Sequence, residues 1–477
     1  MIINKKKLSL IIMSSVIALI GVLWTVLSLL PKQFPILSYV PSSYSVSGNG
    51  STSVMVDDYL YYVNGIISIN DIGYKDNEYY PNGQIPPSSI YRVHIKPDGK
   101  PDITYLYAED DVSTTDIDES ETIIGVKSGP QCVVPKIAGT GDFALFVFGD
   151  TLIYTTPNNQ KNKNGIFQVN RTDFFSVKLD GSNNTRLYTT DNDVARTDFS
   201  VVFKNGVFIF INDGGVLKRI DMNGNVNVIA EDVSSVKFPE VYEYGRAFSN
   251  SKESAFNGVM NYVYYTKARE ESDSKLGNLM YRVALDTRTV DTIGDDGDLD
   301  RGVTFTPISV SNNKFLFTSK DSNDALTHLI EGKEDKTQLP VTSFASSVPS
   351  FYIAENKVFF ILNSNLYSLN PSSTNHTLVA SGFDTPHVTL ISNDKIYINS
   401  NNLSLLVLNY DGSQSGSSVD ISNITTGSLS LPIYFDAHGY PLNGVSRKML
   451  IFNLSSAKVS SLSIFDEDLN KDILIIS

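Results

Sequence analysis

The fold is decided by a repeated pair of segments, and one copy reads LIYTT at residues 152–156 and FSVKLDGSNNTRL at residues 175–187. In the second segment Phe175, Val177 and Leu179 alternate with polar residues, which is the period of a β-strand with one buried face. The pair Asp180-Gly181 that follows tolerates the positive φ angles of a tight turn. One unit therefore consists of an aromatic strand, a second apolar strand and a turn.

Eight such units follow one another along the chain. Their first strands are expected at Tyr59–Tyr62, Leu152–Tyr154, Val207–Phe210, Val263–Tyr265, Phe315–Phe317, Val358–Phe360, Ile396–Ile398 and Ile433–Phe435. The turns after the second strands are expected to begin at Asp98, Asp180, Asn223, Asp286, Glu331, Asn370, Asp411 and Asn453. Repeats of about 40 to 50 residues with roughly four strands each are typical of β-propellers, whose small sheets bury their faces against one another. The sequence therefore predicts an all-β fold with a single eight-bladed β-propeller, and seven blades are the alternative.

Three polar stretches interrupt the regular spacing of the units. They are Glu109–Glu121, Pro157–Gly165 and Glu240–Phe256. Insertions in repeat proteins form loops on one face, which is often the binding face. We therefore expect these three loops to project from the ring.

The beginning of the chain contains a hydrophobic segment. Leu8–Leu30 is 23 residues long and carries no charge, which is enough, at about 1.5 Å per residue, to cross a hydrocarbon core of about 30 Å. Lys5–Lys7 precede it, and positively charged flanks stay cytoplasmic. A cleaved signal peptide is the alternative, although no small-residue cleavage site follows the segment. The sequence predicts a cytoplasmic tail (1–7), a transmembrane signal-anchor helix (8–30), a flexible tether (31–50) and an ectodomain outside the cytoplasm (51–477).

Charge and cysteine content narrow the range of partners. The chain has 38 Lys and Arg and 52 Asp and Glu residues, so without Lys5–Lys7 there are 35 basic residues against 52 acidic ones and a net charge of −17. Nucleic acids and anionic lipid surfaces need basic patches, so neither is expected as a partner, and basic partners are favoured. Cys132 is the only cysteine, which excludes an intramolecular disulfide and a multi-cysteine metal site.

The sequence contains no linear motif of catalysis. It has no Gly-x-Ser-x-Gly elbow, no P-loop, no dinucleotide-binding glycine motif and no HExxH among its five histidines. The only tryptophan, Trp24, lies in the hydrophobic segment. Sialidase-type aspartate boxes and tryptophan-aspartate repeats, which both need tryptophan, are therefore excluded from the ectodomain, and no catalytic or cofactor-binding residue is assigned.

One metal candidate lies in the segment GDDGDLDRG at residues 294–302. Asp296, Asp298 and Asp300 have the alternating carboxylate spacing that lets a loop wrap a calcium ion. The match is incomplete, because Arg301 and Pro307 stand where the loop would need glycine and a bidentate glutamate. A solvated acidic loop is the alternative.

The repeats resemble those of a known family. The segment pairs at 152–156 and 175–187, and again VYYTK at 263–267 and YRVALDT at 281–287, are similar to the YWTD-type repeats of low-density-lipoprotein-receptor propellers and their bacterial relatives. The family tryptophan is replaced here by Tyr, Thr, Phe or Ile. The resemblance implies a propeller fold and a role in protein recognition, and it transfers no functional residue.

Together these observations predict a membrane-anchored β-propeller outside the cytoplasm, at a cell surface or in a periplasm or lumen, that acts as an interaction platform for a protein or a glycan. An enzyme is the alternative from another class, with a polar site at the mouth of the propeller assembled from residues scattered over several blades. An envelope assembly factor is a third hypothesis, with a binding role and a different partner.

Overall fold

The computed structural model describes the chain from β1 (Val46–Ser47) to β35 (Lys471–Asp472), most completely over residues 170–203 and 206–238. Residues 1–45, 65–86, 108–122, 239–261, 294–304, 421–447 and 473–477, with shorter stretches between strands, lie outside the described residues. The chain divides into two compact units, Met1–Leu37 and Ser38–Ser477, and every described residue belongs to the second. Within the described part, no helix is long and apolar enough to span a membrane. The predicted Leu8–Leu30 helix lies outside that part.

Seven antiparallel sheets follow one another along the chain, and we number them in that order. Sheet 1 has five strands, β1, β2 (Ser53–Val56), β3 (Tyr59–Asn64), β4 (Pro87–His94) and β7 (Gln131–Ala138). Sheet 2 has four strands, β8 (Leu145–Phe148), β9 (Thr151–Pro157), β10 (Thr172–Lys178) and β11 (Thr185–Thr189). Sheet 3 has four strands, β12 (Phe199–Phe203), β13 (Val207–Asp213), β14 (Val216–Asp221) and β15 (Val226–Ala230), and a short 3-10 helix, Arg196–Asp198, precedes it.

The remaining four sheets repeat the four-stranded plan. Sheet 4 contains β16 (Val233–Lys237), β17 (Tyr262–Ala268), β18 (Asn278–Ala284) and β19 (Val290–Ile293). Sheet 5 contains β20 (Phe305–Ser311), β21 (Lys314–Lys320), β22 (Thr327–Lys333) and β23 (Gln338–Phe344). Sheet 6 contains β24 (Ser350–Ala354), β25 (Lys357–Leu362), β26 (Asn365–Leu369) and β27 (His376–Ala380). Sheet 7 contains β28 (His387–Ser392), β29 (Lys395–Asn399), β30 (Ser404–Asn409) and β31 (Val419–Asp420).

Three strand pairs stand beside these sheets. They are β5 (Thr104–Tyr107) with β6 (Ile123–Ser128), β32 (Lys448–Asn453) with β33 (Lys458–Ser463), and β34 (Phe465–Asp466) with β35. The β5–β6 hairpin lies between β4 and β7, where the sequence predicts only a loop. The hairpin explains why the predicted turns at Asp98 and Asp180 are farther apart in the sequence than the later turns.

The predicted strands are confirmed where the structure describes them. Six of the seven aromatic segments from Tyr59–Tyr62 to Ile396–Ile398 lie in the second strand of their sheet, and Tyr59–Tyr62 lies in β3, the third strand of the five-stranded sheet 1. The eighth, Ile433–Phe435, lies outside the described residues. The turns at Asp180, Asn223 and Asp411 are also confirmed, and the glycine after each has a positive φ of 87°, 80° and 89° respectively.

The turn predicted at Glu331 is wrong. Glu331 lies inside β22 and pairs with Leu316 on one side and Leu339 on the other. In the sequence, Glu331-Gly332 resembles the residue pair of a tight turn. In the structure, Gly332 is needed for packing, because a Cβ there would collide with the Phe315 ring. The strand therefore continues through a dipeptide that local turn chemistry would end.

A repeated main-chain contact joins three pairs of consecutive sheets. An added Cβ on Gly181 of sheet 2 would lie 2.9 Å from the carbonyl oxygen of Val133 in sheet 1. An added Cβ on Gly224 of sheet 3 would lie 2.8 Å from the carbonyl oxygen of Leu187 in sheet 2. Gly412 of sheet 7 meets Val379 of sheet 6 in the same way. In sheets 2, 3 and 7 the turn after the third strand thus lies against the outer strand of the preceding sheet.

A repeated side-chain hydrogen bond also joins consecutive sheets. In each case a side chain donates to the carbonyl of the residue that directly follows the third strand of the next sheet. The three bonds are Tyr61 Oη to Leu179 O at 3.1 Å, Arg219 Nη1 to Leu285 O at 2.9 Å and Lys357 Nζ to Tyr410 O at 3.4 Å. The acceptor recurs at the same position of each sheet, although the donors lie on different strands, so the sheets are structural repeats.

The apolar cores lie between sheets. Phe199 of sheet 3 packs edge-on against Phe146 and Phe174 of sheet 2. Phe315 of sheet 5 stacks on Tyr264 of sheet 4, with 4.1 Å between the two ring centroids. Further clusters join sheets 5 and 6 and sheets 6 and 7. Each fully buried aromatic side chain of this kind contributes about 1.5–3 kcal/mol. Both faces of a sheet are therefore needed for stability.

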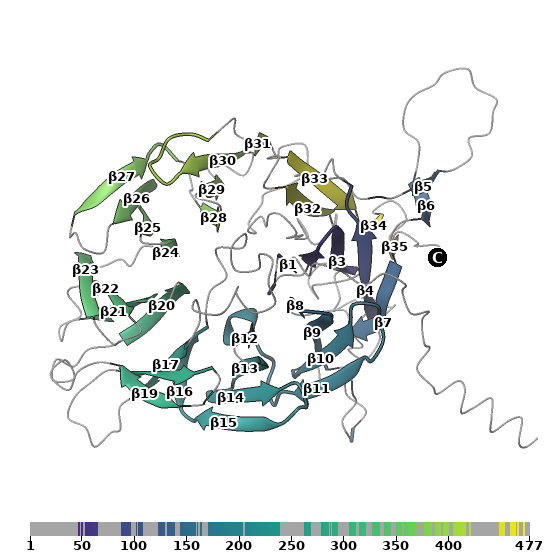
Figure 1. The fold of residues 1–477 in the computed structure, drawn as a ribbon, viewed down its shortest axis with the longest axis horizontal. Helices are drawn as coiled ribbons and strands as arrows, with labels where there is room; N and C mark the ends of the chain where they lie inside the picture. The colour runs from purple at the N-terminus through teal and green to yellow at the C-terminus, as the bar shows by residue number, and fades with distance from the viewer. Residues whose placement is uncertain are drawn as a thin grey trace, which may run out of the picture. The chain divides into compact units, whose positions relative to one another are not determined.

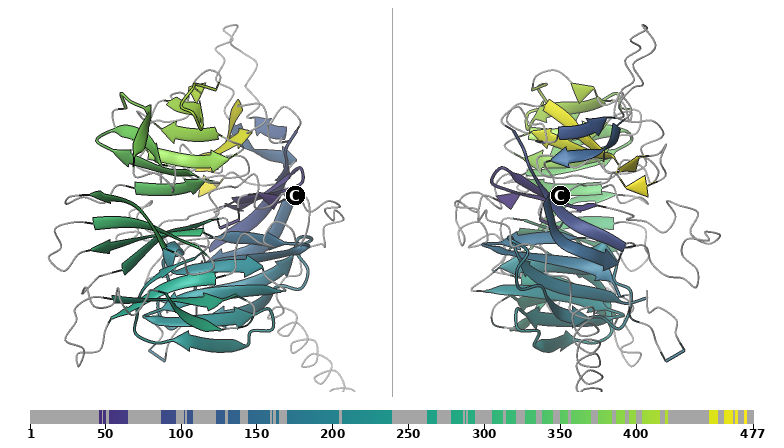
Figure 2. Two further views of the ribbon diagram at one scale, coloured as in Figure 1. Left: turned by 60° about the vertical axis from the view of Figure 1, so that its left-hand side comes forward. Right: turned by 90° about the vertical axis from the view of Figure 1, so that its right-hand side faces the viewer.

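These contacts define a β-propeller. Within the unit Ser38–Ser477, the sheets follow one another around a centre, with the first strand of each sheet inside and the last outside (Figure 1). Figure 2 shows the same succession of sheets from two other directions.

The last residues of the predicted tether belong to sheet 1. Val46 and Ser47 form β1 and pair with β2, and the Asn49 side chain is buried against β8. The tether was expected to reach residue 50 because this stretch has no strand period. Its pairing partners lie elsewhere in the sequence, so local pattern could not reveal them.

Candidate functional site

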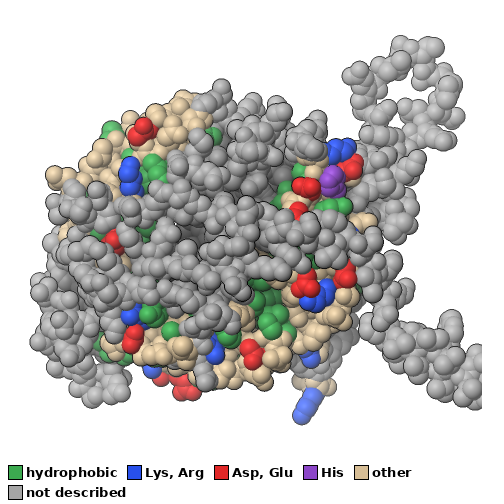
Figure 3. Space-filling view, in the orientation of Figure 1, with side chains coloured by type: hydrophobic (Ala, Val, Ile, Leu, Met, Phe, Trp, Pro, Cys, Tyr) green, Lys and Arg blue, Asp and Glu red, His purple; other side chains and the backbone are tan. Residues whose placement is uncertain are grey.

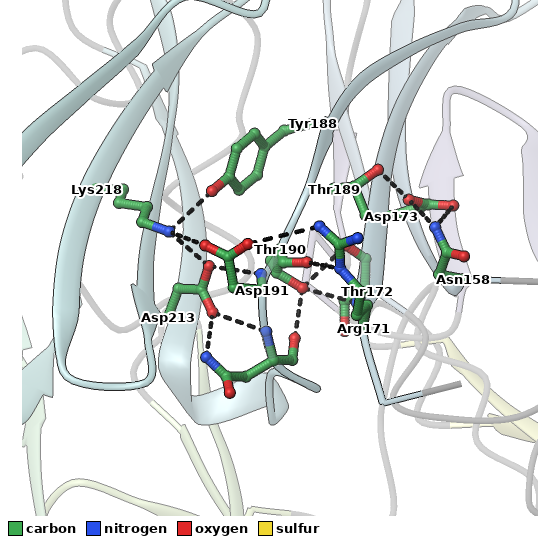
Figure 4. A network of polar contacts seen from close by, with 11 residues as sticks. Asn158, Arg171, Thr172, Asp173, Tyr188, Thr189, Thr190, Asp191, Asp213 and Lys218 are labelled. Atoms are coloured by element: carbon green, nitrogen blue, oxygen red, sulfur yellow. Dashed lines mark hydrogen bonds and ion pairs between the residues drawn. The ribbon is translucent and has the colours of Figure 1, made fainter. Parts of the chain in front are cut away.

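Polar side chains gather where sheets 2 and 3 meet, and we call this cluster the inter-sheet polar network. It lies where the β9–β10 connection, the β11–β12 connection and the β13–β14 turn come together (Figure 4). Gly214 in that turn has a φ of 62°, and a Cβ there would lie 2.5 Å from Asn192 Nδ2. Glycine at position 214 therefore leaves room for the Asn192 side chain of the neighbouring connection. The members of the network are Asn158, Arg171, Thr172, Asp173, Tyr188, Thr189, Thr190, Asp191, Asn192, Asp213 and Lys218.

The carboxylate of Asp213 is the centre of the network. Its side chain is 0% exposed. It accepts hydrogen bonds from the main-chain N–H groups of Asp191 and Asn192 at 2.9 and 3.0 Å, from Asn192 Nδ2 at 2.9 Å and from Lys218 Nζ at 2.7 Å. Burial raises the pKa of Asp213, but these hydrogen bonds outweigh it and lower the pKa below its usual range. Asp213 is therefore ionised and fixes the connection from sheet 2 to sheet 3.

Lys218 donates to three different partners. Its Nζ contacts Asp213, Asp191 at 3.0 Å and the Tyr188 hydroxyl at 3.0 Å. Burial lowers the pKa of Lys218, but the hydrogen bonds to Asp213, Tyr188 and Asp191 outweigh it and raise the pKa. An ammonium group with all three protons engaged is a structural cation and not a nucleophile.

A second part of the network holds the other side of the same connection. Asp173 is buried and accepts hydrogen bonds from Asn158 Nδ2 at 3.0 and 3.2 Å and from the Thr189 hydroxyl. The Thr172 main chain exchanges hydrogen bonds with Thr190. The start of the predicted Pro157–Gly165 loop is thus tied to sheet 2 at Asn158.

The exposed member of the network is Asp191, which is 70% exposed. Figure 4 shows it between Lys218 and Arg171, whose Nη2 lies 3.6 Å away. Arg171, Lys218, Asp191 and Asp213 thus form a chain of ion pairs. Chemically, this arrangement fixes a connection between two sheets and presents a rigid polar surface.

A second set of buried cations recurs in sheets 1, 3 and 4. In each sheet an arginine lies over an aromatic ring of the preceding strand, with distances from Cζ to the ring centroid of 5.1, 4.4 and 3.9 Å. Each ring stands two residues before the residue that pairs with the arginine. The pairs are Arg92 over Tyr59, Arg219 over Phe208 and Arg282 over Tyr262. Sequence reasoning missed this pattern, and its signal is an aromatic-x-aromatic strand followed by a strand that contains arginine.

Lys237 is a partly buried cation of sheet 4. It ends β16, the first strand of sheet 4, opposite Tyr264. Burial lowers the pKa of Lys237 to about 8. A lysine in this range is partly neutral near physiological pH and is therefore more nucleophilic than an exposed one.

The predicted metal site lies outside the described residues. Asp296, Asp298 and Asp300 all fall there, so calcium binding stays a prediction. Across the part of the chain that the structure describes, no group of three or more His, Cys, Asp or Glu side chains is arranged to hold a metal. The predicted loops Glu109–Glu121 and Glu240–Phe256 also lie outside the described residues.

Comparisons with known proteins add little to this description. No protein-family model matches the chain, and no curated protein matches it. Similar solved structures include a chain of a nidogen/laminin complex, which is 9% identical over 70% of this chain and 91% of that chain, with a TM-score of 0.28. The computationally designed protein Ika8 is 10% identical over 81% and 90%, with a TM-score of 0.38. BamB from Moraxella catarrhalis is 10% identical over 67% and 91%, with a TM-score of 0.34. At these values the similarities carry no argument, and the propeller assignment depends on the repeated sheets themselves.

Proposed function

We propose that this chain is an eight-bladed β-propeller that acts as a protein or glycan interaction platform. Seven sheets and the β32–β33 pair together would supply eight blades. The YWTD-type resemblance of the repeats agrees with a recognition role. The observation that carries the proposal is the way in which a connection between sheets is fixed by buried charges, above all by Asp213. A surface held rigid before binding loses less conformational entropy when a partner docks.

We further propose that the propeller is held outside the cytoplasm by the Leu8–Leu30 segment as a single-pass signal anchor. The support is the uncharged length of that segment and the three lysines before it. Protease added to intact cells should then digest the propeller without prior lysis. Full protection until lysis would contradict this topology, and a mature protein that starts near Lys32 would indicate a cleaved signal peptide instead.

Charge identifies the kind of partner. A net charge of −17 outside the membrane steers basic partners toward the surface and repels nucleic acid. Purified full-length chain should therefore capture a partner from the cell envelope whose association slows as salt is added. Shortening Glu240–Phe256 should weaken capture without changing the melting temperature.

An enzyme with its site at the mouth of the propeller is the second candidate. The observation that favours it is Lys237, on a first strand and with a pKa near 8. A carbonyl substrate would form an imine with the neutral amine, and the carbonyl oxygen would leave as water. Turnover that is abolished by Lys237→Met, with the fold unchanged, would support the enzyme over the platform. The envelope assembly factor shares the binding role and differs only in the partner that capture would identify.

A further inference from the structure

Strand β15 carries two neighbouring exposed apolar side chains at the outer edge of sheet 3. Val226 is 43% exposed and Val228 is 56% exposed. Because they are two residues apart in a strand, their side chains lie on the same face. They pair with Ile220 and Lys218 of β14, and β15 is the last strand in the order of its sheet. Their exposure is thus concentrated on one edge strand.

The composition of β15 lacks the usual protection of an edge. Natural edge strands carry charged residues or proline that discourage pairing with another chain. Most outer strands of the other sheets follow this rule, with Pro135 and Lys136 in β7, Arg186 in β11, Asp291 in β19, Pro340 in β23 and Asp420 in β31. The exception is β27, HTLVA, which lacks these residues but has no carboxylate directly at either end. The sequence of β15, VNVIA, contains neither kind of residue. It is an edge that can accept another strand.

Carboxylates flank both ends of β15. Asp221 ends β14 beside the start of β15, and hydrogen bonds from the Asn225 side chain and the main chain lower the pKa of Asp221, so it is ionised at neutral pH. Glu231 and Asp232 directly follow β15 and are exposed. In the orientation of Figure 1, where β15 runs along the lower rim, Figure 3 shows acidic side chains at that rim. The edge is therefore apolar in its middle and negative at its ends.

We propose that β15 binds an extended polypeptide segment as an additional strand, and that this segment has apolar residues at alternating positions and Lys or Arg at both ends. The inference rests on the proposed platform function and specifies its surface and its partner. Strand addition supplies affinity through main-chain hydrogen bonds, and alternate side chains supply specificity. A second copy of this chain does not fit, because pairing β15 with β15 in either direction would bring carboxylates against carboxylates.

The test uses purified full-length chain and a synthetic probe peptide with alternating Val and Thr in the middle and Lys at both ends. Fluorescence anisotropy measures binding, and hydrogen exchange measures protection of the amides of residues 226–230. We expect binding that weakens with added salt, and slower exchange within β15. Matched peptides with Glu at both ends, or with a central Pro, should bind at least about tenfold more weakly.

The variant Val228→Lys places a charge on the edge, and Leu378→Lys is its matched control. Leu378 is 52% exposed on β27, the outer strand of sheet 6. Val228→Lys should lower affinity by at least about tenfold, whereas Leu378→Lys should change it less than about twofold. If Val228→Lys alters the melting curve, Val228→Thr keeps the branched shape and tests the apolar contact alone.

Equal binding of the probe to wild type and to Val228→Lys would overturn the proposal, as would no binding at all or protection outside β15. Capture of partners from the cell envelope distinguishes a failure of the β15 proposal from a failure of the platform function. A partner captured equally by wild type and Val228→Lys would leave the platform function intact and show that β15 is not its binding surface. No captured partner at all would contradict the platform function itself.

Discussion

The side-chain amide of Asn49 forms two hydrogen bonds with the main chain of Val147, although the two residues are 98 positions apart. Asn49 Nδ2 donates to the Val147 carbonyl at 3.1 Å, and Asn49 Oδ1 accepts from the Val147 N–H at 2.7 Å. The neighbouring Gly50 N–H donates to the Leu145 carbonyl at 2.7 Å. The side-chain amide thus forms with Val147 of β8 the two hydrogen bonds that a neighbouring strand would form, and it joins the beginning of sheet 1 to sheet 2.

Asn49→Ala should therefore destabilise the propeller. The change leaves a buried N–H and a buried carbonyl of Val147 without these partners, which costs about 1–3 kcal/mol. Urea unfolding measures the loss, and Asn170→Ala, at an exposed asparagine, is the control, with an expected change within about 0.5 kcal/mol. Equal effects of the two substitutions would show that the Asn49 bridge is dispensable.

Asp213→Asn should destabilise the propeller more than Asp191→Asn. Both carboxylates contact Lys218, but the Asp213 side chain is 0% exposed and the Asp191 side chain is 70% exposed. Breaking the buried pair should cost on the order of 3 kcal/mol, whereas the exposed pair contributes about 0–1 kcal/mol. Urea unfolding at pH 7 measures both, and similar losses would contradict a central role for Asp213.

The same carboxylate predicts how stability depends on acid. The pKa of Asp213 is lowered in the folded state, so its contribution is fully present above the unfolded pKa of about 3.9 and is lost as pH falls through the folded pKa. Below about pH 4, the difference in unfolding free energy between wild type and Asp213→Asn should shrink. A difference that stays constant from pH 7 to pH 3 would exclude this linkage.

Local sequence pattern predicted the strands but not the contacts between sheets. The aromatic segments and the Asp180 and Asn223 turns were predictable because strand period and turn chemistry depend only on neighbouring residues. The sequence wrongly predicts a turn at Glu331, because glycine at position 332 is required by the Phe315 ring of the adjacent strand. Asn49 was assigned to a tether because its partner is far along the chain.

In the candidate site, too, contacts within one sheet could be predicted from the sequence and contacts between sheets could not. Asp213 and Lys218 stand out in the sequence as charges within or beside apolar strands, with Gly214 and Gly215 between them, so a hairpin that brings them together was foreseeable. The contribution of Asp191 could not be predicted, because Asp191 comes from the neighbouring sheet and its position depends on how the two sheets pack.

Lys237 should destabilise the folded state near neutral pH. Burial lowers its pKa from the ordinary value of 10.5 to about 8, so the folded protein binds fewer protons than the unfolded chain between these values, and stability rises with pH across that window. Lys237→Met should therefore stabilise the protein at pH 7, by on the order of 2 kcal/mol. The gain should shrink near pH 10.5, as measured by urea unfolding at both values, and Lys218→Met should be destabilising at pH 7. An equal effect of Lys237→Met at both values would contradict the lowered pKa.

Gly224→Ala should be costly for two separate reasons, and Gly149→Ala isolates one of them. Both glycines have a positive φ, 80° and 59°, which costs a residue with a Cβ about 1–2 kcal/mol. A Cβ at Gly149 meets nothing within 4 Å, whereas a Cβ at Gly224 would lie 2.8 Å from the Leu187 carbonyl oxygen of the preceding sheet. Because that carbonyl is main chain, it cannot move without shifting β11. Gly224→Ala should therefore lower the melting temperature more than Gly149→Ala does, as measured by calorimetry. Equal losses would mean that the backbone angle alone explains the glycine, and that sheets 2 and 3 do not depend on the close approach of this turn.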